Sequence, residues 1–314
     1  MNTSDFWKNF KLGEELSVAG AFIYNGLRRY HEMQSLDYTD ELFEFLYELS
    51  VGFERLLKIA VVLYEHDSSV NQDELERSLM THNHLALLER LRNKTQCKLG
   101  KTQIELLSLL STFYKALRYD RYSLASAYDA KKERQEIFNW LGKNLKVEFN
   151  VKTPLIGNDN EDRYRSFVRR TTLTISRTIY KIIRERAVVC NLYTYELRHG
   201  SKAESVFLRE VDISDEDVLW KELLIFLMNT KLSSGYLDFL RSIEPLDFDP
   251  ALIGDYLECF QSDTGKALVI DELEYYYSEM EDKGERLGLM RNIGAKNLYF
   301  ESDDNDSSEQ DLFI

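Results

Sequence analysis

Hydrophobic residues recur every three or four positions over residues 39–65, a spacing that predicts one long amphipathic helix. Gly52 marks a position where this helix could bend. A polar segment follows, then a short helix near residues 73–80 and another helix whose first turn Thr81 or Asn83 could cap. The expected buried positions of the long helix are Leu42, Leu46, Leu49, Phe53, Leu56, Leu57, Ala60 and Leu63.

The helical period returns at residues 102–119 and again over residues 163–199. Residues 217–229 are apolar on nearly every side, which predicts a central, buried helix, and two more helices are expected after the loop at 243–250. With only 3 Pro and 14 Gly in 314 residues, the chain is predicted to be all-α. In the 163–199 segment the expected buried stripe is Phe167, Ile175, Ile179, Ile182, Ile183, Val189 and Leu192.

The helical pattern weakens after Ala125, where a β-prone stretch, a proline and a cluster of Asn, Asp and Gly indicate a connection. We therefore expect a helical bundle over residues 1–130 and a linker over 131–162. A helical C-terminal domain with a basic first helix would cover 163–296. A disordered acidic tail would cover 297–314, because six of the last fourteen residues are acidic.

The cysteines and the hydropathy argue for a soluble, cytoplasmic protein. The three cysteines lie far apart and form no C-x-x-C pair, so neither a disulfide framework nor a thiolate zinc site is indicated. The first residues do not have the pattern of a signal peptide, and no apolar run approaches the roughly 20 residues that span a bilayer. No metal or cofactor motif is present, and we expect neither.

The net charge of -14 hides a basic segment inside an acidic chain. Residues 163–202 hold ten basic and two acidic side chains, whereas residues 211–314 hold eight basic and twenty-five acidic ones. Arginine forks can hold phosphates and nearby tyrosines can stack on bases, so the segment is a candidate RNA surface. The alternative is pairing with the acidic segment or with a partner. The nucleic-acid candidates here are Arg169, Arg170, Arg177, Lys181, Arg198 and Lys202.

Three stretches of the first block carry a resemblance to a known family: GFERLLKIAVVLY at 52–64, HNHLALLERL at 82–91 and LLSLLSTFYKALRYDRYSL at 106–124. The last contains an L-x-x-x-Y-x-x-x-R-Y element, formed by Leu110, Tyr114, Arg118 and Tyr119. Over about residues 40–130 the chain resembles a HEPN (higher eukaryotes and prokaryotes nucleotide-binding) domain. The resemblance implies a helical bundle that often forms homodimers.

The resemblance also implies a metal-independent endoribonuclease, in which an arginine and a histidine four to six residues later face a cleft. Here Arg118 is followed at positions 123–125 by Ser, Leu and Ala, so that histidine is missing. Arg118 and Tyr122 remain the catalytic candidates, with Tyr119 and Arg121 as RNA contacts. A second spacing of this kind joins Arg77 to His82, although a helix cap at His82 and a solvated face at His84 are the favoured explanation.

Two functions stay open. The chain is either an RNA-binding or RNA-cleaving HEPN-like protein of a prokaryotic antiviral defence or toxin–antitoxin system, or a non-catalytic dimeric scaffold or nucleotide sensor that holds a partner protein. The acidic tail could engage such a partner through its apolar end, Leu312, Phe313 and Ile314. No membrane partner is expected.

Overall fold

The computed structural model describes residues 3–67, 70–120, 122, 124, 132–150, 157–192, 195–197, 201–208, 213–260 and 263–295. Over these residues the regular structure is helical, and the extended pairing is limited to an antiparallel bridge between Ser35 and Asp159. The all-α prediction is confirmed. The chain divides into two compact units, Met1–Ile213 and Ser214–Ile314. No described helix combines the length and apolar character needed to cross a bilayer.

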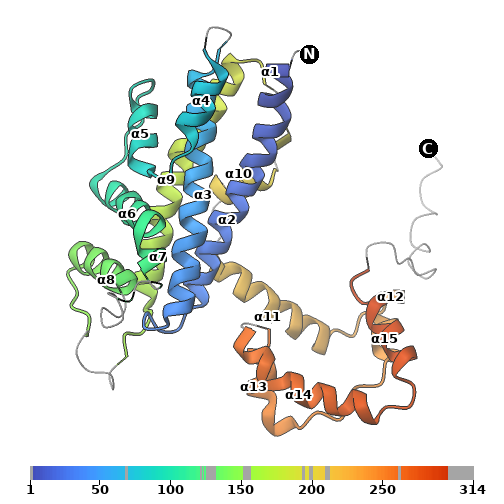
Figure 1. Ribbon diagram of the computed structural model, residues 1–314. Helices are drawn as coiled ribbons and strands as arrows, with labels where there is room; N and C mark the ends of the chain where they lie inside the picture. Colours follow the sequence, from blue (N-terminus) through green and yellow to red (C-terminus); the bar gives the residue numbers. More distant parts are fainter. Residues whose placement is uncertain are drawn as a thin grey trace, which may run out of the picture. The chain divides into compact units, whose positions relative to one another are not determined.

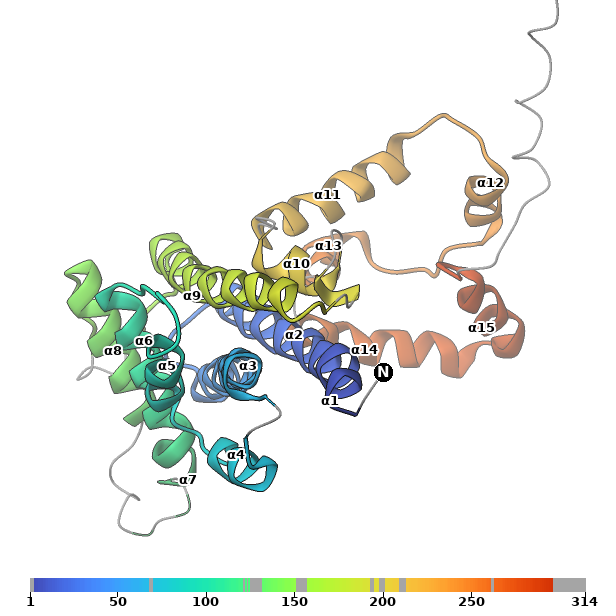
Figure 2. The same ribbon diagram turned by 90° about the horizontal axis from the view of Figure 1, so that it is seen from above.

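Three long helices, α2, α3 and α9, run side by side through unit 1, as Figure 1 and Figure 2 show. Helices α5, α6 and α8 pack on α3 from the other side, and α6 also packs on α9. The helices of unit 1 are α1 Thr3–Phe6, α2 Leu12–Glu32, α3 Thr39–Glu65, α4 Gln72–Leu79, α5 His84–Arg92, α6 Lys101–Thr112, α7 Arg118–Asp120, α8 Lys132–Leu145, α9 Asp162–Val189 and α10 Lys202–Phe207, with π-helical turns at Trp7–Lys11 and Phe113–Leu117.

Helix α3 has the bounds that the hydrophobic period predicts, and all eight of its expected apolar positions are buried. It runs as one unbroken helix through Gly52. A Cβ atom at Gly52 would lie 2.6 Å from Cγ1 of Ile23 on α2, and one at Gly26 would lie 2.8 Å from Cδ2 of Leu49 on α3. The two glycines therefore let α2 and α3 approach closely.

Helix α9 belongs to unit 1, whereas the sequence pattern assigned it to a separate C-terminal domain. Its apolar face, which includes Ile175 and Ile179, is buried against α3, α6 and α2, so the compact unit continues past the expected linker at 131–162.

Helix α9 also ends ten residues earlier than expected, because Asn191 takes a left-handed conformation with φ of 56°. The N–H groups of Asn191 and Leu192 donate to the carbonyls of Val188 and Ala187, which is the Schellman pattern of a helix end. Val189, expected in the buried stripe, is exposed.

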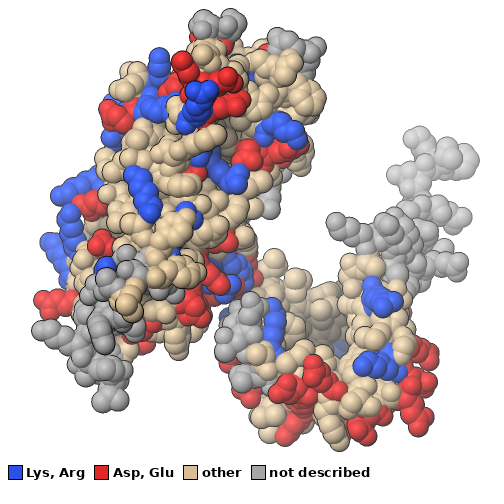
Figure 3. All heavy atoms as spheres, viewed as in Figure 1, with Lys and Arg blue, Asp and Glu red and all other residues tan. Residues whose placement is uncertain are grey.

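Unit 2 contains shorter helices, and none of its described hydrophobic side chains is buried. The helix predicted to be central and buried is instead exposed: Leu223, Ile225 and Met228 expose 50%, 56% and 76% of their surface. On the face of unit 2 seen in Figure 3, acidic side chains gather along one edge. The helices are α11 Ile213–Asn229, α12 Gly235–Ser242, α13 Ile253–Glu258, α14 Asp263–Glu279 and α15 Lys283–Asn292.

Candidate functional site

The side chain of Arg118 lies over two tyrosine rings at the end of α6. Its Cζ atom is 3.9 Å from the ring centroid of Tyr114 and 4.5 Å from that of Tyr119. One of its terminal nitrogens donates a hydrogen bond of 2.7 Å to the Tyr119 hydroxyl. No carboxylate among the described residues pairs with Arg118, so its charge is held by π faces rather than neutralised.

A π-helical turn, Phe113–Leu117, gives Arg118 this position. The Arg118 N–H donates to the carbonyl of Phe113, five residues earlier, where an α-helix would use the carbonyl four residues earlier. The wider turn holds one extra residue and shifts the phase of the helix between Tyr114 and Arg118. This change in phase accompanies the stacking of the two side chains.

His82 reaches the same tyrosine from the segment before α5. The ring centroids of His82 and Tyr114 are 4.7 Å apart, and the ring planes are nearly perpendicular, at 84°. His82 and Arg118 therefore both contact Tyr114, although the sequence pattern treated them as parts of two unrelated motifs. We name the group formed by Glu54, Lys58, His82, Tyr114, Arg118 and Tyr119 the Tyr114 cluster.

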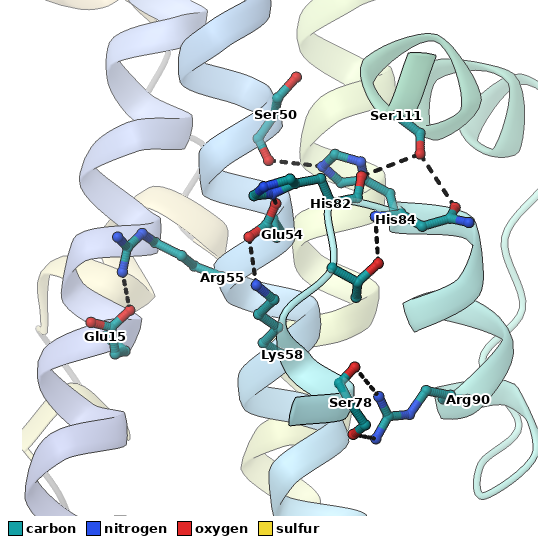
Figure 4. Close-up of polar contacts among 12 residues, drawn as sticks. Glu15, Ser50, Glu54, Arg55, Lys58, Ser78, His82, His84, Arg90 and Ser111 are labelled. Carbon is teal, nitrogen blue, oxygen red and sulfur yellow. Dashed lines mark hydrogen bonds and ion pairs between the residues drawn. The ribbon is translucent and has the colours of Figure 1, made fainter. Parts of the chain in front are cut away.

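Glu54 on α3 orients the His82 ring, as Figure 4 shows. Its Oε2 atom lies 2.8 Å from His82 Nδ1, and its Oε1 atom lies 2.6 Å from the Lys58 ammonium. A carboxylate that pairs with an ammonium can only accept a hydrogen bond, so the proton of this contact belongs to His82 Nδ1. In neutral His82 the free electron pair is then on Nε2, and no described residue bonds to that atom.

His84, two residues after His82, is fully buried, so the predicted solvated face at His84 is wrong. Its Nε2 donates to the Ser50 carbonyl at 2.8 Å, and its Nδ1 has no partner among the described residues. Burial lowers the pKa of His84 to about 4, against a smaller opposing effect of the Ser50 hydrogen bond. The residue is therefore neutral at pH 7 and structural.

The segment that carries His82 is fixed by polar contacts with α6. The Ser111 hydroxyl lies 3.4 Å from the His82 carbonyl and 3.3 Å from Asn83 Oδ1, and that oxygen also accepts from the Ala86 N–H. Asn83 is thus the N-cap of α5, one of the two predicted caps. His82 precedes the cap and is free to extend outward, with 49% of its side chain exposed.

The Tyr114 phenol stays protonated at neutral pH. Burial raises its pKa, the nearby Glu54 charge raises it further, and the Arg118 charge acts in the opposite direction. The ring is half-buried between α3 and the π-helical turn, where it also packs against Tyr47 at 5.9 Å between centroids. The neutral ring of Tyr114 is therefore the surface on which His82 and Arg118 pack.

Of the other two predicted catalytic residues, Arg77 makes no described contact with this cluster, whereas the Tyr122 N–H donates to the carbonyl of Tyr119, one of its members. Arg77 is exposed on α4, and no described contact joins it to His82, so the Arg77–His82 spacing does not form a pair. Tyr122 exposes 90% of its surface and Tyr119 57%, which leaves both rings accessible from water. Arg121 lies outside the described residues.

Several basic side chains of α9 bond to other groups within unit 1. Arg177 donates to the Phe207 carbonyl and Arg186 to the Leu63 carbonyl, while Arg184 pairs with Glu204 at 3.8 Å. Arg169 is half-buried, whereas Arg170 and Lys181 are exposed. Arg198, the side chain of Lys202, and the tail residues Leu312, Phe313 and Ile314 lie outside the described residues.

Glu54 and Lys58 were missed by the sequence analysis because both lie inside an apolar helical stretch. A usable signal was present: Glu54 falls between Phe53 and Leu56, on a helix face that is otherwise buried, and only 8% of it is exposed. A buried carboxylate needs partners, and the nearby histidines were the candidates.

Among the described residues, no three His, Cys, Asp or Glu side chains come together as a metal site would require. No family model, curated protein or solved structure matches the chain.

Proposed function

We propose that the chain binds RNA at the Tyr114 cluster and cleaves it without a metal ion, as a HEPN-like ribonuclease. The observation that carries this proposal is the shared contact of His82 and Arg118 with Tyr114. Strand cleavage needs a proton acceptor at the ribose 2′-hydroxyl and a cation at the phosphate. The histidine missing after Arg118 is replaced, in space, by one that comes from an earlier part of the chain.

In the proposed reaction, His82 Nε2 accepts the proton of the 2′-hydroxyl while the 2′-oxygen forms a bond to phosphorus. The bond from phosphorus to the 5′-oxygen breaks, and that oxygen leaves with a proton from water. The products are a 2′,3′-cyclic phosphate and a 5′-hydroxyl. Glu54 keeps Nδ1 protonated and stabilises the imidazolium that forms, while Arg118 stabilises the charge on the phosphate oxygens.

Exposed aromatic side chains in the cluster and beside it support binding of unpaired RNA. Tyr119 and Tyr122 present accessible rings, and bases that are not stacked in a duplex can stack on such rings. Arg170 and Lys181 on α9 provide further phosphate contacts in this proposal.

The proposal is tested by incubating the full-length protein with total RNA or tRNA in EDTA and mapping the product ends. Cleavage should yield 2′,3′-cyclic phosphates. His82→Asn and Arg118→Ala should each reduce the rate by roughly 10²-fold or more. Arg77→Ala is the matched control, because Arg77 is an exposed arginine near His82 in sequence but outside the cluster, and it should retain full activity. RNA left intact by the wild-type protein would overturn the proposal.

A second candidate function, a dimeric scaffold or nucleotide sensor that holds a partner protein, is supported by the exposed apolar helix α11. It predicts RNA left intact and a stoichiometric partner. In either case we propose a cytoplasmic protein, and the HEPN resemblance suggests a role in antiviral defence or in a toxin–antitoxin pair.

A further inference from the structure

Helix α11 is apolar on all sides of its second half. Residues 223–228 read LLIFLM, and successive residues turn by about 100° around a helix, so these six positions cover its whole circumference. Leu223, Phe226 and Leu227 each expose 46% to 50% of their surface. A helix that is apolar all round is normally buried, and α11 therefore needs a covering surface.

The packing that the described residues of unit 2 make on α11 lies on one side of the helix. Trp220 stacks on Phe260, with ring centroids 5.6 Å apart, and Leu224 on the same side is half-buried. On the adjoining side, Leu219, Leu223 and Phe226 follow one another at helical spacing and expose 58%, 50% and 46%. We name these three residues the α11 seam.

The charges of α11 indicate which surface fits the seam. Asp215, Glu216 and Asp217 lie at the start of the helix, and Lys231 lies just after its end. Leu223 is midway between Asp215 and Lys231. A second α11 in antiparallel orientation therefore brings the acidic start of each helix to the lysine of the other, whereas a parallel copy would oppose like charges.

A two-fold axis through Leu223 also makes the seam complementary to itself. In the antiparallel pair Leu219 faces Phe226 of the second copy, and Leu223 faces its own counterpart. Such an isologous contact is closed, so it yields a dimer and no fibre. The helix dipoles are then antiparallel as well.

We propose that α11 is a self-association helix, which pairs antiparallel with α11 of a second copy of this chain through Leu219, Leu223 and Phe226. The pairing uses no residue of the Tyr114 cluster and does not depend on the proposed RNA chemistry. It explains why the described residues of unit 2 leave the apolar side chains of this helix exposed.

The first test is the oligomeric state of the full-length protein by sedimentation equilibrium or light scattering. The wild-type protein should be a dimer, and Leu223→Asp should raise the dimer dissociation constant by roughly 30-fold or more. Ile225→Asp is the matched control, because Ile225 is equally exposed at 56% but lies on another side of α11. A monomeric wild-type protein, or a dimer that Leu223→Asp leaves unchanged, overturns the proposal.

The second test addresses orientation. Lys231→Glu should weaken the dimer, and combining it with Asp215→Lys should restore affinity, because the charges exchange places across an antiparallel pair. Leu223→Cys should form an intermolecular disulfide with its own counterpart under mild oxidation, whereas Val218→Cys, off the seam, should not. A double variant weaker than Lys231→Glu alone contradicts the antiparallel arrangement.

Discussion

His82 and Arg118 lie against the same ring, that of Tyr114: the imidazole approaches it at 4.7 Å and the guanidinium at 3.9 Å. One side chain comes from the segment before α5 and the other from the end of a π-helical turn. The site depends on the packing of α3, α5 and α6, since Glu54, His82 and Tyr114 belong to different parts of the bundle.

Glu54→Gln should reduce RNA cleavage by roughly 10² to 10⁴-fold while leaving RNA affinity nearly unchanged. The amide nitrogen of glutamine can donate to His82 Nδ1, which moves the imidazole proton to Nε2 and removes the electron pair that accepts the 2′-hydroxyl proton. Single-turnover rates and binding measured on the same RNA separate the two effects. Glu89→Gln, an exposed residue on α5, is the control, and equal rates for both variants would count against the orienting role of Glu54.

Protein stability should fall as the pH drops from about 6.5 to about 4, because burial lowers the pKa of His84 to about 4. In this window the unfolded chain binds a proton at His84 that the folded chain does not bind, so acid favours unfolding by up to ~3 kcal/mol. Above pH 6.5 this contribution is constant.

Urea titrations of His84→Leu at several pH values check the assignment. Its free energy of unfolding should be lower at pH 7, since the bond to the Ser50 carbonyl is lost, but should decline less steeply between pH 6.5 and 4. His82→Asn, at a half-exposed histidine, should keep the steep decline. If the free energy of unfolding declined with pH equally steeply in His84→Leu and the wild type, His84 would not be the source of the acid sensitivity.

Gly52→Ala should destabilise unit 1 by about 1 to 3 kcal/mol, because its Cβ would lie 2.6 Å from Cγ1 and 3.1 Å from the backbone nitrogen of Ile23. Gly20→Ala, on the facing helix α2, has only ordinary contacts at 3.7 Å and should be neutral or stabilising by up to about 1 kcal/mol. Denaturant midpoints compare the two. An equal loss of unfolding free energy in both variants would mean that the close approach of α2 and α3 at Gly52 does not cause the destabilisation.

RNA affinity should decrease steeply with salt, and Arg170→Ala and Lys181→Ala should each reduce the slope of log K against log salt concentration by about 1. Both side chains are exposed on α9. Lys143→Ala is the control, since its ammonium is already paired with Glu105 at 2.6 Å. Slopes unchanged by Arg170→Ala and Lys181→Ala would remove α9 from the RNA surface.

The hydrophobic period predicted α3 within its observed bounds because every turn of that helix contributes to one core. The same reasoning applied to α11 was wrong, since an apolar helix needs a covering surface but its sequence does not say that its own chain supplies it. The end of α9 was also missed, because the left-handed turn is made by Asn191 rather than by a glycine. Helix α2 had an apolar period of its own that was not used, formed by Leu12, Leu16, Ala19, Ile23, Leu27 and Tyr30.

Arg118 was identified from the sequence, whereas its relation to His82 was not. Sequence spacing paired His82 with Arg77, because a short motif relates only residues that lie close together along the chain. The contact between His82 and Tyr114 depends on tertiary packing. The role of Glu54 also depends on tertiary packing, since its partner His82 belongs to the segment before α5.

The π-helical turn at Phe113–Leu117 makes the Tyr114 cluster sensitive to chain length. Losing one codon there, for example that of the exposed Ala116, would restore a regular helix and rotate Arg118 by about 100° relative to Tyr114. The buried side chains of α6 up to Phe113 would keep their places, whereas Leu117, which packs against the core, would rotate together with Arg118. An insertion or deletion of a single residue would thus suffice to create or remove the stacking of Arg118 on Tyr114 during evolution. Homologues should therefore be sorted by the length of this turn before their side chains are compared.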